Sequence, residues 1–210
     1  LIVVLFAMLT VAAWGYANRP TSEPALPRVI HGFAFQPYQK DQDAIAGEDP
    51  TSAQIDADLK LLAGTTRAVR TYSSIGTLGE IPALARKHGL KVMLGSWIDS
   101  DRERNDREVE AAIRLANTNR NVTRILIGNE VVLRGDLPVE DLIAHLDRVR
   151  AATKQPVSTA EPWHVWIKHP ELARDVDFIA VHLLPYWEGI AADDAIGFVT
   201  DRLAEVKKKF

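Results

Sequence analysis

Carboxylates, aromatic rings and one arginine follow short apolar runs along the chain, and residues of these types suit the binding of a sugar polymer. Carboxylates accept hydrogen bonds from hydroxyl groups, and an indole ring offers an apolar face to a pyranose ring. The chain has five tryptophans, and four of them lie at or near these positions. The residues concerned are Arg70, Tyr72, Trp97, Asp99, Asn129, Glu130, Glu161, Trp163, His182, Tyr186 and Trp187. A set of this kind predicts a carbohydrate site that contains carboxylates.

Six apolar runs alternate with segments of helical period, and this alternation is expected to bring the polar side chains to one rim. The runs span residues 29–35, 68–72, 91–95, 124–128, 155–160 and 178–182. The apolar helical faces are Ile55, Leu59 and Leu62; Val109, Ala112, Ile113 and Ala116; Leu142, Ile143, Leu146 and Val149; and Ile196, Val199, Leu203 and Val206. Such a pattern predicts parallel βαβ units. Their spacing of roughly thirty residues fits a (β/α)₈ TIM barrel, in which reactive side chains lie at the C-terminal ends of the strands.

A doubly wound α/β fold is the alternative architecture. It would normally carry a glycine-rich phosphate turn after its first strand, whereas residues 35–39 read Phe-Gln-Pro-Tyr-Gln. The barrel is therefore favoured. Because six units are found where a barrel needs eight, we expect residues 28–210 to be an incomplete barrel, truncated after about six βα units. The alternative is a complete small α/β domain.

The motif that ends the fourth predicted strand resembles glycoside hydrolase family 17, a family of retaining (β/α)₈ glycosidases. The motif is Ile127-Gly128-Asn129-Glu130. Segments 157–163 (Val-Ser-Thr-Ala-Glu-Pro-Trp) and 177–186 (Asp-Phe-Ile-Ala-Val-His-Leu-Leu-Pro-Tyr) support the bacterial branch of that family. The resemblance covers about residues 28 to 210.

The resemblance implies hydrolysis or transglycosylation of β-1,3-linked glucans by double displacement, with two carboxyl groups about 5 Å apart. It implies that Glu130 is the acid/base and that Asn129 bonds the 2-hydroxyl of the reacting sugar. Arg70 and Tyr186 are implied to lie near the nucleophile. Tyr72, Trp97, Glu161, Trp163 and His182 are predicted to bind substrate as part of the rim. The nucleophile belongs to a seventh strand, so we expect the chain to continue for about two more units, with a glutamate ending the seventh strand.

Each of these residues also has a purely structural interpretation. Glu130 can form a structural pair with Arg134, and Arg70 can pair with a structural carboxylate. His182 can be a satisfied core histidine, and Glu161 a solvated loop residue. Trp163 and Trp166 can pack against helices, which is the favoured interpretation for Trp166.

No cofactor is expected, and two segments that mimic metal sites are interpreted otherwise. His164 and His169 have no third ligand nearby. Residues 99–110 imitate a calcium loop, but Arg104 replaces the required glycine, so a solvated helix start is favoured. The net charge of -3 and the absence of cysteine argue against nucleic-acid binding, a thiolate metal site and a cysteine nucleophile.

The N-terminal segment differs from the rest of the chain. Residues 1–17 carry no charge, and Gly15-Tyr16-Ala17 offers the small-x-small pattern of a signal-peptidase site. We therefore expect a signal peptide or membrane anchor over 1–17 and a linker over 18–27. A buried first helix or strand is the alternative. Export to a periplasmic, extracytoplasmic or membrane-anchored location is the expectation.

Three functions stay open. The first is a β-1,3-glucan hydrolase or glucanosyltransferase, and the sequence does not distinguish between them. The second is a non-catalytic glucan-binding or assembly protein. The third is an enzyme of the same clan that acts on another β-glycan, such as cellulose or mannan. The bacterial branch also implies a possible link to a membrane glycosyltransferase.

Overall fold

Six parallel strands form one curved sheet in the computed structural model, which describes residues 2–19, 30–44 and 46–210. The strands are β1 (Phe33–Ala34), β2 (Ala68–Arg70), β3 (Lys91–Ser96), β4 (Val122–Asn129), β5 (Val157–Pro162) and β6 (Ala180–His182). They pair in the order β1-β2-β3-β4-β5-β6, so every strand lies beside its neighbour in the sequence. This order matches six consecutive units of a (β/α)₈ barrel and confirms the predicted fold class. A doubly wound sheet reverses its strand order, and this sheet does not.

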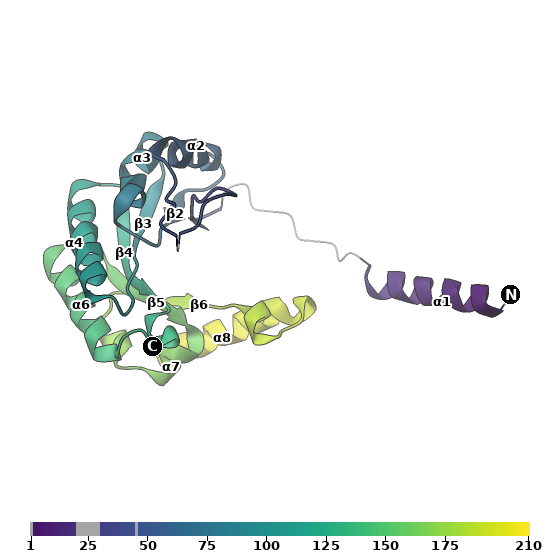
Figure 1. Ribbon diagram of the computed structural model, residues 1–210. Helices are drawn as coiled ribbons and strands as arrows, with labels where there is room; N and C mark the ends of the chain where they lie inside the picture. Colours follow the sequence, from purple (N-terminus) through teal and green to yellow (C-terminus); the bar gives the residue numbers. More distant parts are fainter. Residues whose placement is uncertain (1, 20–29, 45) are drawn as a thin grey trace.

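Helices cover the outer side of the curved sheet, which gives the domain a crescent shape (Figure 1). The longer helices are α2 (Ser52–Leu62), α3 (Ile81–Lys87), α4 (Arg102–Thr118), α6 (Val139–Ala152), α7 (Trp163–Lys168) and α8 (Ala195–Lys209). The short elements are α5 (Val131–Arg134) and the 3₁₀ turns η1 (Gly76–Glu80), η2 (Leu172–Arg174), η3 (Pro185–Glu188) and η4 (Ala192–Asp194).

The predicted apolar faces are buried in three of the four helices for which they were predicted. Ile55 and Leu59 of α2, and Leu142 and Leu146 of α6, have no exposed surface. Val109 and Ala112 of α4 are likewise fully buried. In α8 only Val206 is buried, and Ile196 is 77% exposed. The difference arises because α8 packs mainly on α7, η3 and η4, at one edge of the sheet.

Helix starts follow the local sequence. Thr51 and Gln54 form a reciprocal capping box at the start of α2. The side chain of Asp101 accepts a hydrogen bond from the backbone N–H of Arg104 and so caps α4. The segment that imitates a calcium loop is thus the start of a helix, as predicted.

Strand ends differ from the prediction where they matter for the site. The first strand shrinks to Phe33–Ala34, and Ile30 forms an isolated bridge to Thr66. Residue 29 lies outside the described residues. In contrast, β5 extends to Pro162, so Glu161 belongs to the sheet and not to a loop.

The N-terminal segment forms helix α1 (Ile2–Ala17), none of whose residues is buried. The alternative of a buried first element is therefore wrong. No helix within the described residues is long and apolar enough to cross a membrane. Most of the predicted linker 18–27 lies outside the described residues.

Candidate active site

Four side chains from three different strand ends meet in one chain of contacts. Nδ1 of His182 lies 2.6 Å from Oε1 of Glu130, and its Nε2 lies 3.1 Å from Nη1 of Arg70. The other terminal nitrogen of Arg70 donates to Oδ1 of Asn129 at 2.6 Å. Because the curved sheet brings the ends of β2, β4 and β6 to one rim, residues 112 positions apart become neighbours.

These contacts determine which atoms of the four side chains donate hydrogen bonds and which accept them. A guanidinium only donates hydrogen bonds, so Nε2 of His182 accepts from Arg70, and Nδ1 carries the ring proton. His182 therefore donates to Oε1 of Glu130. Burial lowers the pKa of His182 despite its contact with Glu130, which favours this neutral ring. By the same reasoning Asn129 turns its oxygen to Arg70 and keeps its amide N–H groups available as donors.

The backbone at the motif is bent sharply. Glu130 has φ 58° and ψ 32°, and it is the one non-glycine residue with positive φ within the described residues. Left-handed backbone costs a residue with a Cβ roughly 1–2 kcal/mol. Gly128 also has positive φ, and a Cβ there would lie 2.4 Å from a methyl carbon of Val131. The motif therefore needs glycine at 128 and places an unfavourable conformation at Glu130, which is common at functional sites.

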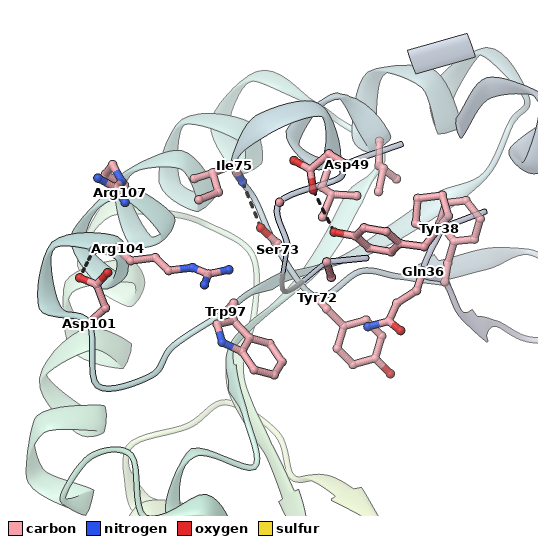
Figure 2. Close-up of a pocket in the computed structure, with 16 residues that line it drawn as sticks. Gln36, Tyr38, Asp49, Tyr72, Ser73, Ile75, Trp97, Asp101, Arg104 and Arg107 are labelled. Atoms are coloured by element: carbon pink, nitrogen blue, oxygen red, sulfur yellow. Dashed lines mark hydrogen bonds between the residues drawn. The ribbon is translucent and has the colours of Figure 1, made fainter. Parts of the chain in front are cut away.

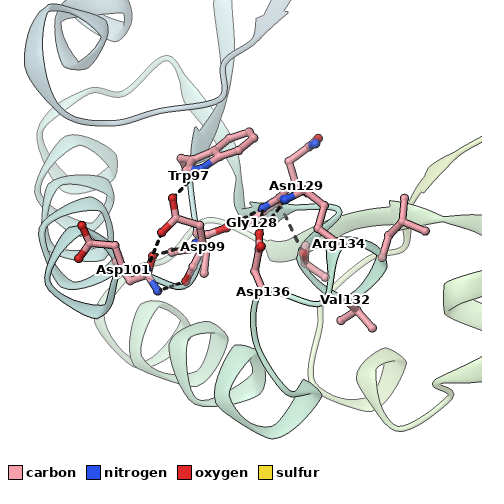
Figure 3. Close-up of polar contacts among 12 residues, drawn as sticks. Trp97, Asp99, Asp101, Gly128, Asn129, Val132, Arg134 and Asp136 are labelled. Atoms are coloured by element: carbon pink, nitrogen blue, oxygen red, sulfur yellow. Dashed lines mark hydrogen bonds and ion pairs between the residues drawn. The ribbon is translucent and has the colours of Figure 1, made fainter. Parts of the chain in front are cut away.

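Arg134 holds this bend through several side-chain contacts (Figure 3). Its guanidinium donates to the backbone oxygen of Asn129, to that of Ile98 at 2.8 Å, and to Asp136 at 2.7 Å. The guanidinium also lies 4.5 Å from the ring centre of Trp97. The predicted alternative of a Glu130–Arg134 pair is wrong, because Arg134 pairs with Asp136 and Glu130 contacts His182.

Glu161 holds the short helix α5 that follows the same bend. Its side-chain oxygens accept hydrogen bonds from the backbone N–H groups of Val132 at 2.9 Å and Leu133 at 3.3 Å. Burial, which is the largest cause, raises the pKa of Glu161 to about 7. Glu161 has no exposed surface, so its carboxylate faces α5 in place of the predicted sugar. The solvated-loop interpretation is wrong for the same reason.

A pocket of about 730 Å³ opens beside this cluster, over the ends of β1, β2 and β3 (Figure 2). Tyr72 and Trp97 line it, as does Tyr38, whose hydroxyl donates to Asp49 at 3.0 Å. Burial and Asp49 raise the pKa of Tyr38 to about 12. Tyr72 also stacks on Arg70 at 4.5 Å. Aromatic walls therefore connect the pocket to the Arg70–Glu130 chain.

A second buried glutamate supports this pocket from behind. Glu108 on α4 accepts from the Ser73 hydroxyl at 2.5 Å and from the backbone N–H of Ser74 at 2.7 Å. It has no exposed surface, and burial raises its pKa to about 7. Ser73 lines the pocket, so Glu108 fixes the loop that forms the pocket wall.

Comparison with known proteins matches this arrangement to a family of glycosidases. The family model described as the BtgE/BtgC glycoside hydrolase domain matches residues 32–210. The chain belongs to this family. Its sequence is 31% identical over 167 residues to the glucan 1,3-beta-glucosidase of Schizosaccharomyces pombe, covering 72% of this chain and 52% of that one. It is 25% identical to the "Probable glucan endo-1,3-beta-glucosidase btgC" of Aspergillus flavus, covering 88% of this chain and 30% of that one.

The fold is similar to that of a solved enzyme. The glycoside hydrolase family 17 beta-1,3-glucanosyltransferase from Rhizomucor miehei superposes with a TM-score of 0.72 at 25% identity, covering 86% of this chain and 66% of that one. An active-site mutant of that enzyme in complex with laminaritriose gives 0.73. These matches confirm the resemblance to family 17, while the bacterial branch stays a prediction. The chain spans about half of the length of the first of these curated relatives and less than a third of the length of the second.

The remaining predicted residues of this glycosidase domain lie further out. Trp163 is half-buried, donates to Glu188 at 2.9 Å and stacks on Arg202 of α8 at 4.7 Å. Trp166 is fully buried and donates to the oxygen of Ala180, as its favoured structural interpretation predicts. Tyr186 is 83% exposed and meets Trp187 edge to face, so the structure does not bring it to Arg70 and Glu130.

Sequence reasoning missed the residues that hold the site in place. Those residues are Tyr38, Ser73, Arg104, Glu108, Arg134 in its clamping contacts, and Asp136. Glu108 carried a usable signal, because it shares the buried face of α4 with Asn105 and Ala112 at helical spacing. Arg134 gave no such signal in the sequence, since its partners Ile98 and Asp136 lie in loops.

Proposed function

We propose that the full-length protein acts on β-1,3-glucan with retention of configuration, and that Glu130 is its acid/base. The observation that carries the proposal is the hydrogen-bonded chain from Glu130 through His182 and Arg70 to Asn129 at the C-terminal ends of three strands. The similar proteins named above, a glucan 1,3-beta-glucosidase and a beta-1,3-glucanosyltransferase, support β-1,3-glucan as the substrate.

The geometry assigns the proton of the acid to one atom of Glu130. Oε1 accepts from His182, so the proton for the glycosidic oxygen resides on Oε2. As that oxygen leaves with the proton, a second carboxylate bonds to the anomeric carbon and forms a glycosyl-enzyme. Glu130 then takes a proton from the incoming water or sugar hydroxyl, which displaces the carboxylate. Glu161 is buried and bonded to α5, so it is not free to act as this second carboxylate.

The neighbouring residues hold substrate around Glu130. The Asn129 amide has N–H donors for the 2-hydroxyl of the reacting sugar, because Arg70 already occupies its oxygen. Tyr72 and Trp97 present ring faces in the pocket beside it. This arrangement suits hydrolysis and glucanosyl transfer equally well.

The decisive test is laminarin digestion by the full-length protein and its Glu130→Gln variant. We expect the variant to lose about 10²- to 10⁴-fold in rate, the range for removal of a general acid. Glu140→Gln, an exposed change on α6, is the matched control and should retain activity. A Glu130→Gln enzyme as active as wild type removes Glu130 from the mechanism.

Two substrate comparisons separate the alternatives. Cellulose and mannan digested faster than laminarin would favour an enzyme of the same clan with another specificity. Laminarin bound but never cleaved by the wild type would favour a glucan-binding protein. Among the products, chains longer than the starting oligosaccharide indicate transfer, and shorter chains alone indicate hydrolysis.

We also propose that the apolar segment 1–17 directs export, as a signal peptide or an anchor. The support is a 16-residue apolar helix without a charged residue. Cell fractionation and N-terminal sequencing test it: a mature protein that begins at Asn18 supports cleavage, and an unprocessed protein retained in the cytoplasm contradicts export. The link to a membrane glycosyltransferase stays a prediction from the resemblance.

A further inference from the structure

We propose that Glu161 is a positioning residue for the acid/base, which holds the left-handed backbone of Glu130 in place through the first turn of α5. The inference rests on the proposed function of Glu130. It gives a buried strand residue a role in the reaction, although that residue does not touch the substrate.

The contacts connect Glu161 to the bend in two steps. Its carboxylate binds the N–H groups of Val132 and Leu133, which are the second and third residues of α5. Glu130 is the residue immediately before α5, and its own N–H donates to the oxygen of Ala160 at 2.7 Å. The segment 130–133 is therefore bonded to two consecutive residues of β5, at its first residue and again two residues later.

A carboxylate suits this place because the first N–H groups of a helix have no partner within the helix. Two such donors point at Glu161, and its two oxygens accept one each. An amide side chain has one oxygen and would turn a donor toward one of these N–H groups. A shorter or apolar side chain would leave both of them without this acceptor in a partly buried position, which costs free energy at each group.

The test compares Glu161→Gln with wild type in the full-length protein on laminarin. We expect kcat to fall about 10- to 100-fold, since small misplacement of a reacting group has effects of this size. KM should change less than about threefold, because Glu161 does not contact substrate.

Glu108→Gln is the matched control, since Glu108 is equally buried and its pKa is also about 7. This control should affect KM more than kcat. An equal fall of kcat in both variants, or a Glu161→Gln enzyme with wild-type kcat, would overturn the inference. So would a loss of kcat that only follows the fraction of unfolded protein in circular dichroism.

Hydrogen exchange keeps the inference testable without activity. In Glu161→Gln and Glu161→Ala, the amides of residues 131–134 should exchange at least about tenfold faster than in wild type, while α6 stays protected. Unchanged exchange would overturn the inference. If the wild-type protein cleaves no glucan, but the variants still exchange faster than the wild type, the proposed function is refuted and the contact itself is supported.

Discussion

Glu108 and Glu161 are two buried glutamates with nearly the same environment and different positions in the fold. Neither has exposed surface, both accept backbone N–H bonds, and burial raises the pKa of each to about 7. Glu108 lies on a helix and holds the loop after β2. Glu161 lies on a strand and holds the helix after β4.

The same arrangement, a buried glutamate that accepts backbone N–H bonds, therefore supports two different parts of the site. The loop held by Glu108 contributes Ser73 to the pocket. The helix held by Glu161 begins directly after Glu130. We therefore expect damage at Glu108 to affect mainly glucan binding, and damage at Glu161 to affect mainly the chemical step.

The pH dependence of stability tests what the two glutamates share. A carboxyl group whose pKa is higher in the folded than in the unfolded state binds its proton more tightly when folded, so stability falls as pH rises through this range. A rise from 4.5 to about 7 corresponds to roughly 3 kcal/mol for each group. Urea unfolding of the full-length protein should show this loss between pH 4.5 and 7.

Each glutamine variant should remove its own share of that pH dependence, and Glu140→Gln should not. Glu108→Gln and Glu161→Gln should flatten the curve by similar amounts, because burial is the largest cause at both sites. A variant with the wild-type slope would show that its glutamate ionises in the folded protein as it does in water.

Arg134 offers a test of the chemical side of the comparison. It holds the bend through contacts that Glu161 does not share, with the backbone oxygens of Asn129 and Ile98. Arg134→Lys keeps the charge and loses the planar fork, so we expect kcat to fall about 10-fold or more with little change in KM. Steady-state kinetics on laminarin measures both constants.

Arg104→Lys is the control, because Arg104 lines the pocket near Glu108. It should change KM more than kcat. An Arg134→Lys enzyme in which only KM changes would contradict the division between the two regions.

The architecture could be predicted because the apolar periodicity of each strand and helix is visible within one short stretch of the sequence. The runs 91–95 and 124–128 lie within β3 and β4, and Glu130 follows β4 as expected. Glu161 was misjudged since β5 continues past the apolar run through Glu161 to Pro162. In the sequence, a charged residue near the end of an apolar run resembles a loop residue, because the hydrogen-bond donors that allow its burial come from another segment.

The contacts that hold the site were beyond the sequence for a related reason. Val132 and Leu133 bind Glu161 with backbone atoms, which leave no trace in residue type. Tyr186 was placed near the nucleophile by resemblance, whereas the structure exposes it on η3. Side-chain patterns identify strands and their ends, but tertiary packing decides which ends meet.

Glu108→Gln tests the binding side of the comparison. The variant keeps one acceptor for Ser73 or the Ser74 amide and loses the other, so the pocket wall should loosen. We expect KM for laminarin oligosaccharides to rise about three- to tenfold, in line with the loss of one hydrogen bond. A kcat that falls further than KM rises would assign Glu108 to the chemical step as well.

Tyr38→Phe is the mildest test of the same pocket. The change removes the hydroxyl that donates to Asp49 at 3.0 Å, on the exposed side of the wall. Burial and Asp49 hold the pKa of Tyr38 at about 12, so the hydroxyl keeps its proton across the working pH range. Loss of such a bond costs about 0.5–1.5 kcal/mol, and wall residues pass only part of this to the ligand. We therefore expect KM to rise about twofold at unchanged kcat, with the exposed change Glu140→Gln on α6 as the control. A rise of about tenfold in KM corresponds roughly to the full free energy of such a hydrogen bond and would mean that the Tyr38 hydroxyl binds the glucan directly. Glucan binding would then depend more on the loop after β1 than on the loop that Glu108 holds.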